Sequence, residues 1–194
     1  MKHGAEPFQS VLPATAVVTE TRALCAKLVD GAMNRQVFLE RCARLANQAV
    51  GCSRTGIWLF VDEADGRILR CIAMYDARAD RMTHAPDERR EVQPYFDALE
   101  TEGYVSASDT LSHPATAGIF GSRLNDRGVQ SLLASSFAVN GHLFGAFTCT
   151  QVGARQEWTS RQLGTLRQIG AQASLALFTS SRFTPDTGLA PLLN

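Results

Sequence analysis

The segment Thr55-Gly56-Ile57-Trp58-Leu59-Phe60-Val61 is rich in β-branched and aromatic residues, and the polar turn Asp62-Glu63-Ala64-Asp65-Gly66 follows it. A second apolar run, Arg67-Ile68-Leu69-Arg70-Cys71-Ile72-Ala73-Met74-Tyr75, comes directly after this turn. Two β-prone runs joined by a short loop with Asp-Gly at its tip predict a β-hairpin. Both runs are apolar on both faces, so we expect the sheet to be covered on each side.

A second hairpin is predicted nearer the C-terminus. Val129 to Ala138 and His142 to Thr150 are apolar, β-prone runs separated by Asn140-Gly141. Asn-Gly in this position is the strongest short hairpin signal that a sequence offers. A brief strand is also expected from Tyr104 to Ala107. Neighbouring hairpins of this kind favour a mainly antiparallel sheet.

Helical periodicity marks both ends of the chain. Two apolar stripes precede the first strand, and a third follows the last strand, where Thr159 and Gln162 have the spacing of a capping box. The N-terminal stripes consist of Val17, Thr21, Leu24 and Leu28, and of Phe38, Cys42, Leu45, Ala46 and Ala49. The C-terminal stripe consists of Leu163, Leu166, Gly170, Ala173 and Leu177.

Residues 76–127, which we call the insert, break the regular pattern. The insert contains one short predicted helix, Pro94 to Glu100, and is otherwise rich in Ser, Thr, His, Pro and Gly. Long irregular insertions in compact domains are often functional. The predicted fold class is therefore α+β: a central, mainly antiparallel β-sheet with the N- and C-terminal helices on one face and the helix/loop insert on the other.

Composition limits the classes of function. The 194-residue chain is 45% apolar and 20% charged, and nineteen Lys and Arg balance nineteen Asp and Glu. We expect an N-terminal helical extension over 1–34, one folded domain over 35–179 and a flexible tail over 180–194. Zero net charge argues against nucleic-acid binding, and the longest apolar run, Gly56 to Val61, is too short to span a membrane. No convincing export signal is present, which predicts a cytoplasmic protein.

Five stretches, taken together, resemble the GAF domain, a small-molecule-sensing module common in bacterial signalling proteins. They are Ser53 to Phe60, Leu69 to Asp76, Pro94 to Leu99, Gly128 to Leu133, and Gly145 to Cys149 with Trp158-Thr159. The likeness covers about Phe38 to Phe178 and is greatest to the GAF modules that precede diguanylate cyclases and histidine kinases. It implies a six-stranded or similar antiparallel sheet, a ligand cavity between the sheet and the insert, and pairing of subunits through the terminal helices. This sequence departs from those proteins because no output domain is expected to follow.

Enzymatic chemistry is poorly supported by the sequence. Some GAF proteins reduce free methionine sulfoxide with clustered cysteines near the cavity, but no cysteine lies between Tyr75 and Thr148. Cys71 and Cys149 are expected to share a sheet face, yet an apolar strand raises a thiol pKa. A chromophore bound covalently through cysteine is also poorly supported, because the insert contains no cysteine to attach it. The lone histidines His84 and His113 have no metal-ligand spacing, so no metal and no catalytic residue is predicted.

A binding cavity remains as the functional interpretation, with a packed core under a covering loop as the alternative. Aromatic side chains would supply apolar walls, and short polar groups in the insert would orient a ligand by hydrogen bonds. The candidate ligand-binding residues are Trp58, Phe60, Cys71, Tyr75, Tyr95, Tyr104, Asp109, His113, Thr116 and Ser131. The cofactor or ligand itself is not predicted.

The leading functional prediction is a non-enzymatic sensor in bacterial signal transduction, with an unidentified small molecule bound between the sheet and the insert. The alternatives are a ligand-free GAF scaffold for protein–protein interaction and, less favoured, a redox enzyme like methionine sulfoxide reductase. The stripes over Val17 to Leu28 and Leu163 to Leu177 either pair two subunits or only cover the sheet. The additional N-terminal helix favours a homodimer, and a signalling protein is a further candidate partner.

Overall fold

The computed structural model describes residues 12–88, 92–120, 128–139 and 141–181. Most of the tail predicted over 180–194, and the first part of the N-terminal extension, lie outside these ranges. The helices are α1 (Ala14–Val29), α2 (Arg35–Val50), α3 (Gln93–Glu102), α4 (Ala117–Phe120) and α5 (Ser160–Ser181). The strands are β1 (Arg54–Glu63), β2 (Gly66–Asp76), β3 (Arg81–Thr83), β4 (Tyr104–Ala107), β5 (Val129–Val139) and β6 (His142–Val152).

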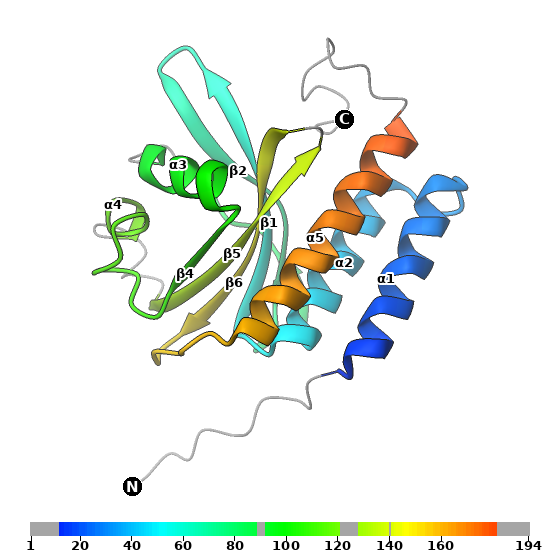
Figure 1. The fold of residues 1–194 in the computed structure, drawn as a ribbon, viewed down its shortest axis with the longest axis horizontal. Helices are drawn as coiled ribbons and strands as arrows, with labels where there is room; N and C mark the ends of the chain where they lie inside the picture. Colours follow the sequence, from blue (N-terminus) through cyan, green and yellow to red (C-terminus); the bar gives the residue numbers. More distant parts are fainter. Residues whose placement is uncertain (1–11, 89–91, 121–127, 140, 182–194) are drawn as a thin grey trace, which may run out of the picture.

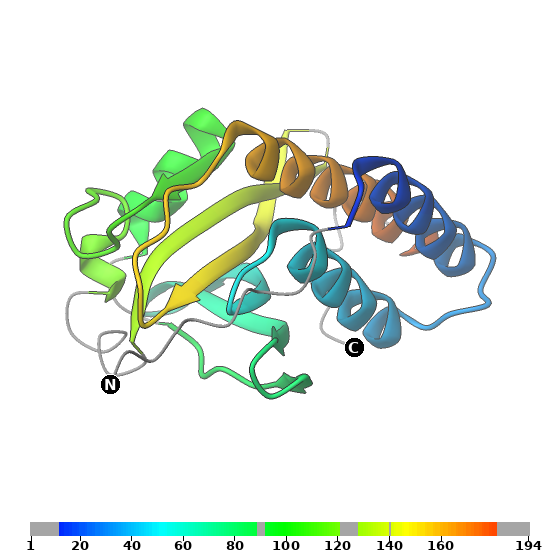
Figure 2. The same ribbon diagram turned by 90° about the horizontal axis from the view of Figure 1, so that it is seen from below.

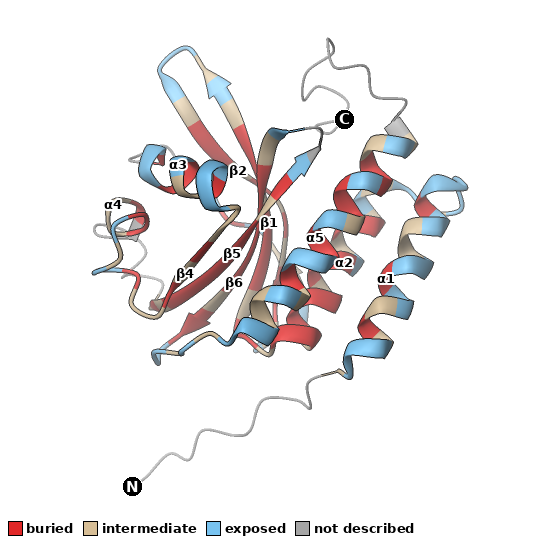
Figure 3. Ribbon diagram, in the orientation of Figure 1, coloured by how far each residue is buried: buried red, intermediate tan, exposed pale blue. Residues whose placement is uncertain are grey.

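The strands form one six-stranded sheet in the order β3-β2-β1-β6-β5-β4, and every pairing is antiparallel. Helices α2 and α5 cover one face, α1 packs on their outer side, and α3 and α4 lie over the other face (Figures 1 and 2). The predicted α+β architecture is confirmed, including the two hairpins and the brief strand Tyr104–Ala107. Both faces of the central strands are buried, as their two-sided apolar pattern predicts (Figure 3).

Local sequence signals set the helix boundaries. Asn34 caps α2 because its side-chain oxygen accepts a hydrogen bond from the Val37 N–H at 2.9 Å. The predicted capping box also forms at α5: the Gln162 N–H donates to Thr159 Oγ1 at 3.2 Å, and the Thr159 N–H donates to Gln162 Oε1 at 2.9 Å. Each pair satisfies backbone donors that the first helical turn leaves without partners.

The apolar stripes of the terminal helices pack against other elements of the same chain. Val17, Thr21 and Leu28 of α1 are buried, and α1 packs against α2 and α5. On α5, Leu166, Ala173 and Leu177 are buried in the core between the helices and the sheet. Subunit pairing would therefore use the outward faces, where Leu175 is 63% exposed. Homodimer formation stays a prediction, which sedimentation velocity can test.

None of the helices in the described ranges is long and apolar enough to cross a membrane.

Candidate functional site

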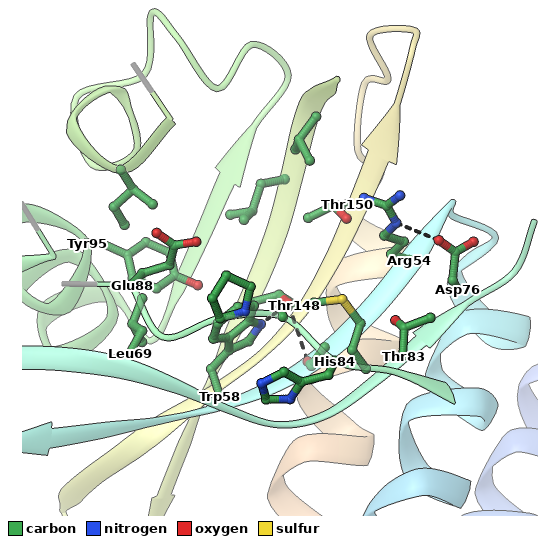
Figure 4. Close-up of a pocket in the computed structure, with 17 residues that line it drawn as sticks. Arg54, Trp58, Leu69, Asp76, Thr83, His84, Glu88, Tyr95, Thr148 and Thr150 are labelled. Carbon is green, nitrogen blue, oxygen red and sulfur yellow. Dashed lines mark hydrogen bonds and ion pairs between the residues drawn. The ribbon is translucent and has the colours of Figure 1, made fainter. Parts of the chain in front are cut away.

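A cavity of about 510 Å³ lies between the sheet and the insert (Figure 4). Its floor comes from β1, β2, β5 and β6, and its roof from α3, α4 and residues 83–88, which we call the cap segment. This volume is typical of small-molecule sites, which range over about 300–1,000 Å³. The lining residues are Arg54, Gly56, Trp58, Leu69, Met74, Asp76, Thr83, His84, Ala85, Pro86, Glu88, Tyr95, Ile119, Val129, Leu132, Thr148 and Thr150.

Trp58 is fixed across the floor of the cavity. Strand alternation places Arg54, Gly56 and Trp58 on the cavity face of β1. The Trp58 indole N–H donates to Thr148 Oγ1 at 3.1 Å, and the Thr148 hydroxyl donates to the Gly56 carbonyl at 3.3 Å. Gly56 allows this arrangement because a Cβ there would lie 2.5 Å from Trp58 Nε1. The indole is therefore an anchored apolar surface with its polar atom already satisfied.

We expect Gly56→Ala to displace the Trp58 ring and to lower the free energy of unfolding by about 1–3 kcal/mol, the usual cost of overpacking. The added methyl group would also lie 3.0 Å from Thr148 Oγ1, so both partners of the hydrogen bond would have to shift. Urea unfolding and the Trp58 fluorescence spectrum measure the two effects. Gly164→Ala on α5 is the matched control, because a Cβ there meets nothing within 4 Å. An unchanged emission spectrum in Gly56→Ala would contradict the expected displacement.

Arg54 and Asp76 form an ion pair at one end of the cavity. They are cross-strand partners of β1 and β2, and Arg54 Nε donates to Asp76 Oδ2 at 2.7 Å. Asp76 Oδ1 accepts the backbone N–H groups of Arg78 at 3.0 Å and Ala79 at 3.4 Å. Burial alone would raise the pKa of Asp76, but these donors and the Arg54 charge outweigh it and hold the pKa below its ordinary value. Both carboxylate oxygens of Asp76 thus already accept hydrogen bonds, and one of these bonds orients Arg54.

Tyr95 carries an unsatisfied hydroxyl at the opposite end. The side chain projects from α3 and is 2% exposed. Among the described residues its hydroxyl oxygen has no hydrogen-bond partner. Burial raises the pKa of Tyr95 far above its ordinary value, so the group is a neutral phenol. An unpaired buried hydroxyl is costly, which makes Tyr95 an available donor for a bound molecule.

The cap segment is attached to the sheet through β2. Leu69 and Glu88 exchange two backbone hydrogen bonds of 2.9 Å each. Arg70 adds ion pairs to Asp87 at 3.2 Å and to Glu63 at 3.1 Å. These contacts hold the cap segment over the cavity. Within it, Ala85 is buried and His84 is exposed at the rim.

Of the ten predicted site residues, Trp58 and Tyr95 line the cavity. Phe60 lies on the same face but packs under α3, with its ring 4.8 Å from Phe96 in an edge-to-face arrangement. The ring centre of Tyr104, on β4, lies 5.7 Å from Cζ of the Arg167 guanidinium. The structure therefore separates the predicted aromatic residues into two that line the cavity and others that belong to its surroundings.

Tyr75 faces the helices instead of the cavity. Its hydroxyl donates to Asp80 Oδ1 at 2.7 Å, and the Arg44 guanidinium lies 4.4 Å from the ring centre. The reason is a bulge in β2: Trp58 pairs with Cys71 but Ile57 pairs with Ala73, so Ile72 is an extra residue. The bulge reverses the alternation beyond it and turns Asp76, rather than Tyr75, toward the cavity.

The polar candidates in the insert and on β5 hold the loop in place. Asp109 Oδ1 accepts the Leu111 N–H at 3.1 Å, and His113 Nδ1 accepts the Ala115 N–H at 3.2 Å. Thr116 Oγ1 donates to the Thr110 carbonyl, and Ser131 Oγ donates to the Ser108 carbonyl, both at 2.8 Å. None of these four side chains is among the described residues that line the cavity.

None of the five cysteines, all of which are described, lines the cavity. Cys71 pairs with Trp58 on the cavity side of the sheet, whereas Cys149 pairs with Thr55 and belongs to the core under the helices. The expectation that these two cysteines share a face is therefore wrong. Burial raises the pKa of Cys149 well above its ordinary value.

Sequence reasoning did not identify Arg54, Asp76, Thr148, Thr150 or the cap segment as site residues. The alternation of Arg54, Gly56 and Trp58 was an available signal, because the three positions share one face of a strand. Asp76 had no comparable signal, since its orientation depends on the bulge at Ile72.

Comparisons with known proteins agree with this geometry. The GAF domain family model matches residues 34–177. The GAF domain of a cyanobacterial phytochrome with bound phycoerythrobilin is similar in fold, with TM-score 0.69 and 13% identity, over 88% of this chain and 97% of that one. The GAF domain of cyanobacteriochrome TePixJ has TM-score 0.60 and 17% identity, over 77% and 92%.

Free methionine-R-sulfoxide reductase from Neisseria meningitidis, solved with its substrate, is a third similar structure, with TM-score 0.61 and 16% identity over 92% of this chain and 98% of that one. At such identities the likeness establishes the fold alone. No curated protein sequence matches significantly. The family match spans the sheet, the cavity and the flanking helices α2 and α5, and the chain therefore belongs to the GAF domain family, a family of sensory and signalling domains.

Proposed function

We propose that this protein is a non-enzymatic sensor in bacterial signal transduction, which binds a small molecule in the cavity between the sheet and the insert. The observation that carries the proposal is the buried Tyr95 hydroxyl, which has no partner among the described residues, in a cavity of about 510 Å³. A filled core would leave neither the space nor the unsatisfied polar atom. The absence of cysteine from the cavity lining supports binding rather than thiol chemistry.

A route from the cavity to the helices runs through the start of β1. Arg54 follows Cys52 and Ser53, whose polar groups join several elements. Asn47 Nδ2 of α2 donates to the Cys52 carbonyl at 3.0 Å, and the Ser53 carbonyl accepts the Ala77 N–H at 3.0 Å. Gln162 Nε2 of α5 donates to the Val50 carbonyl at 2.8 Å. A ligand that moves Arg54 would act directly on the junction of α2, α5 and the sheet, provided that it prefers one of two arrangements.

Thermal-shift screening against metabolites, nucleotides and oxyanions, with Trp58 fluorescence as the second signal, tests the proposal. We expect one ligand class to raise Tm and to change the emission of Trp58. In Trp58→Phe the emission change should disappear while the Tm shift persists, because Trp158 lies elsewhere and donates to the Ala107 carbonyl at 3.3 Å. If no class shifts Tm and a crystal structure shows the cavity filled by side chains, the scaffold alternative replaces the sensor.

A further inference from the structure

We propose that the ligand is a flat, largely apolar carboxylic acid whose carboxylate binds Arg54 and whose far end presents a hydrogen-bond acceptor to Tyr95. This inference rests on the proposed function and names the chemical class that the cavity selects. It follows from three properties of the lining. Arg54 has terminal N–H groups that can donate to a ligand, Tyr95 has a hydroxyl that can donate, and the fixed indole of Trp58 lies between them.

Arg54 presents a free donor edge to the cavity. Its Nε is the atom that binds Asp76, and no described residue is a partner of Nη1 or Nη2. The side chain is 27% exposed, and that of Asp76 is 12% exposed. A guanidinium held by its Nε presents its two terminal nitrogens in the planar arrangement that matches a carboxylate.

The donors at the two ends of the cavity determine which end the carboxylate takes. The two oxygens of Asp76 already accept from Arg54 and from the backbone of Arg78 and Ala79, so Asp76 is a poor counter-ion for a cationic ligand. The other end holds Tyr95 (Figure 4), which offers one neutral donor. Charged donors bind a carboxylate more strongly than a neutral one, so the acid group belongs at Arg54.

The two ends differ in the hydrogen bond that they offer. Arg54 supplies charged donors, whereas Tyr95 supplies one neutral donor inside an apolar wall that includes Leu69 and Ile119. Trp58 lies between the two ends in Figure 4, and its N–H is already bonded to Thr148. The middle of the cavity therefore offers an aromatic face without a free polar atom, which suits a flat apolar body.

Matched probes test the three parts of this inference on the unmodified protein. We would use aromatic keto acids of increasing length: the planar 4-acetylbenzoate and 6-acetyl-2-naphthoate, and 4′-acetylbiphenyl-4-carboxylate, whose two rings are twisted about the bond that joins them. Each is compared with its primary amide, with the ethyl compound that lacks the ketone, and with the corresponding arylmethylamine. Titrations followed by calorimetry and Trp58 fluorescence give Kd. We expect at least one length to bind, its amide to bind about 10–100-fold more weakly, and its ethyl analogue about 5-fold more weakly.

Three variants assign these preferences to residues. Arg54→Gln should abolish the preference for acid over amide, whereas Arg54→Lys should keep part of it. Tyr95→Phe should abolish the preference for ketone over ethyl. It should also raise Tm by about 3 °C, because it removes a buried hydroxyl that has no partner in the described part of the chain. A purely structural role for Tyr95 would give no change in the ketone preference.

Equal binding of acids and amides, or tighter binding of the amines, would overturn the inference. So would failure of every acid to bind while another class raises Tm in the general screen, and that result would leave the proposed function standing. If no class raises Tm and a crystal structure shows the cavity filled by side chains, the proposed function fails together with the inference.

Discussion

Gly145→Ala is expected to cost about 4 kcal/mol of stability and to leave little folded protein at 37 °C. Gly145 lies on β6 opposite Leu59 of β1, in the middle of the sheet. A Cβ at this position would lie 1.8 Å from the Trp58 carbonyl oxygen and 2.8 Å from Leu59 Cα. Both obstacles are backbone atoms, so no rotamer change relieves the clash and the strands must separate locally.

Urea unfolding followed by far-UV circular dichroism measures this cost. The matched control is Gly170→Ala, because Gly170 is also buried and its nearest contact from a Cβ is an ordinary 3.5 Å to Phe147 Cδ2. Ala favours a helix over Gly, so the control should be neutral or more stable by up to about 1 kcal/mol. A midpoint for Gly145→Ala within error of the unsubstituted protein would show that the strands accommodate the methyl group.

The central strands could be predicted because their signals are local. The Asn140-Gly141 turn and the Asp-Gly turn before Arg67 each fix a hairpin by their own backbone preferences. The capping box of Thr159 and Gln162 is equally local, and both of its backbone hydrogen bonds form. Features that need only neighbouring residues are therefore read correctly from the chain.

Which side chains near the end of β2 face the cavity could not be predicted, because their orientation depends on a bulge that no local signal marks. Simple alternation from Cys71 places Tyr75 on the side of Trp58, and the bulge at Ile72 turns it to the helix side. No Gly or polar residue marks this bulge in the sequence, since Cys71, Ile72 and Ala73 are all apolar. One extra residue thus exchanges Tyr75 for Asp76 at the cavity and supplies the partner of Arg54.

The polar candidates Thr116, in the insert, and Ser131, on β5, show a second limit of prediction from sequence. Thr116 and Ser131 were predicted as ligand contacts because short polar side chains suit such a role, yet each donates to a backbone carbonyl of the same region. Composition identifies a loop with many donors but does not say whether backbone or ligand receives them. Tyr95 differs because α3 buries its hydroxyl where none of the residues that the structure describes accepts a hydrogen bond from it.

Phe147→Ala is expected to lower the free energy of unfolding by about 3–5 kcal/mol. The Phe147 ring is fully buried between the sheet and α5, with its centre 5.8 Å from that of Phe137. Its removal leaves a void that the paired strands cannot close. Urea unfolding measures the loss, and Leu175→Ala, at a side chain that is 63% exposed, should change stability by no more than about 0.5 kcal/mol.

Phe147→Ala also tests whether ligand binding in the cavity depends on the packing of the helices against the sheet. Thr148, the next residue along β6, lines the cavity on the opposite face, so the floor under Trp58 stays in place when the Phe147 ring is removed. Ligand affinity per folded molecule should therefore remain within about 3-fold of the unsubstituted value, while the support of α5 against the sheet is lost. Stability falling with affinity unchanged would locate the energetic role of Phe147 in the helix layer. A parallel loss of affinity would instead show that the two faces of the sheet behave as one unit, and that any ligand bound over Trp58 is coupled to α5 through β6.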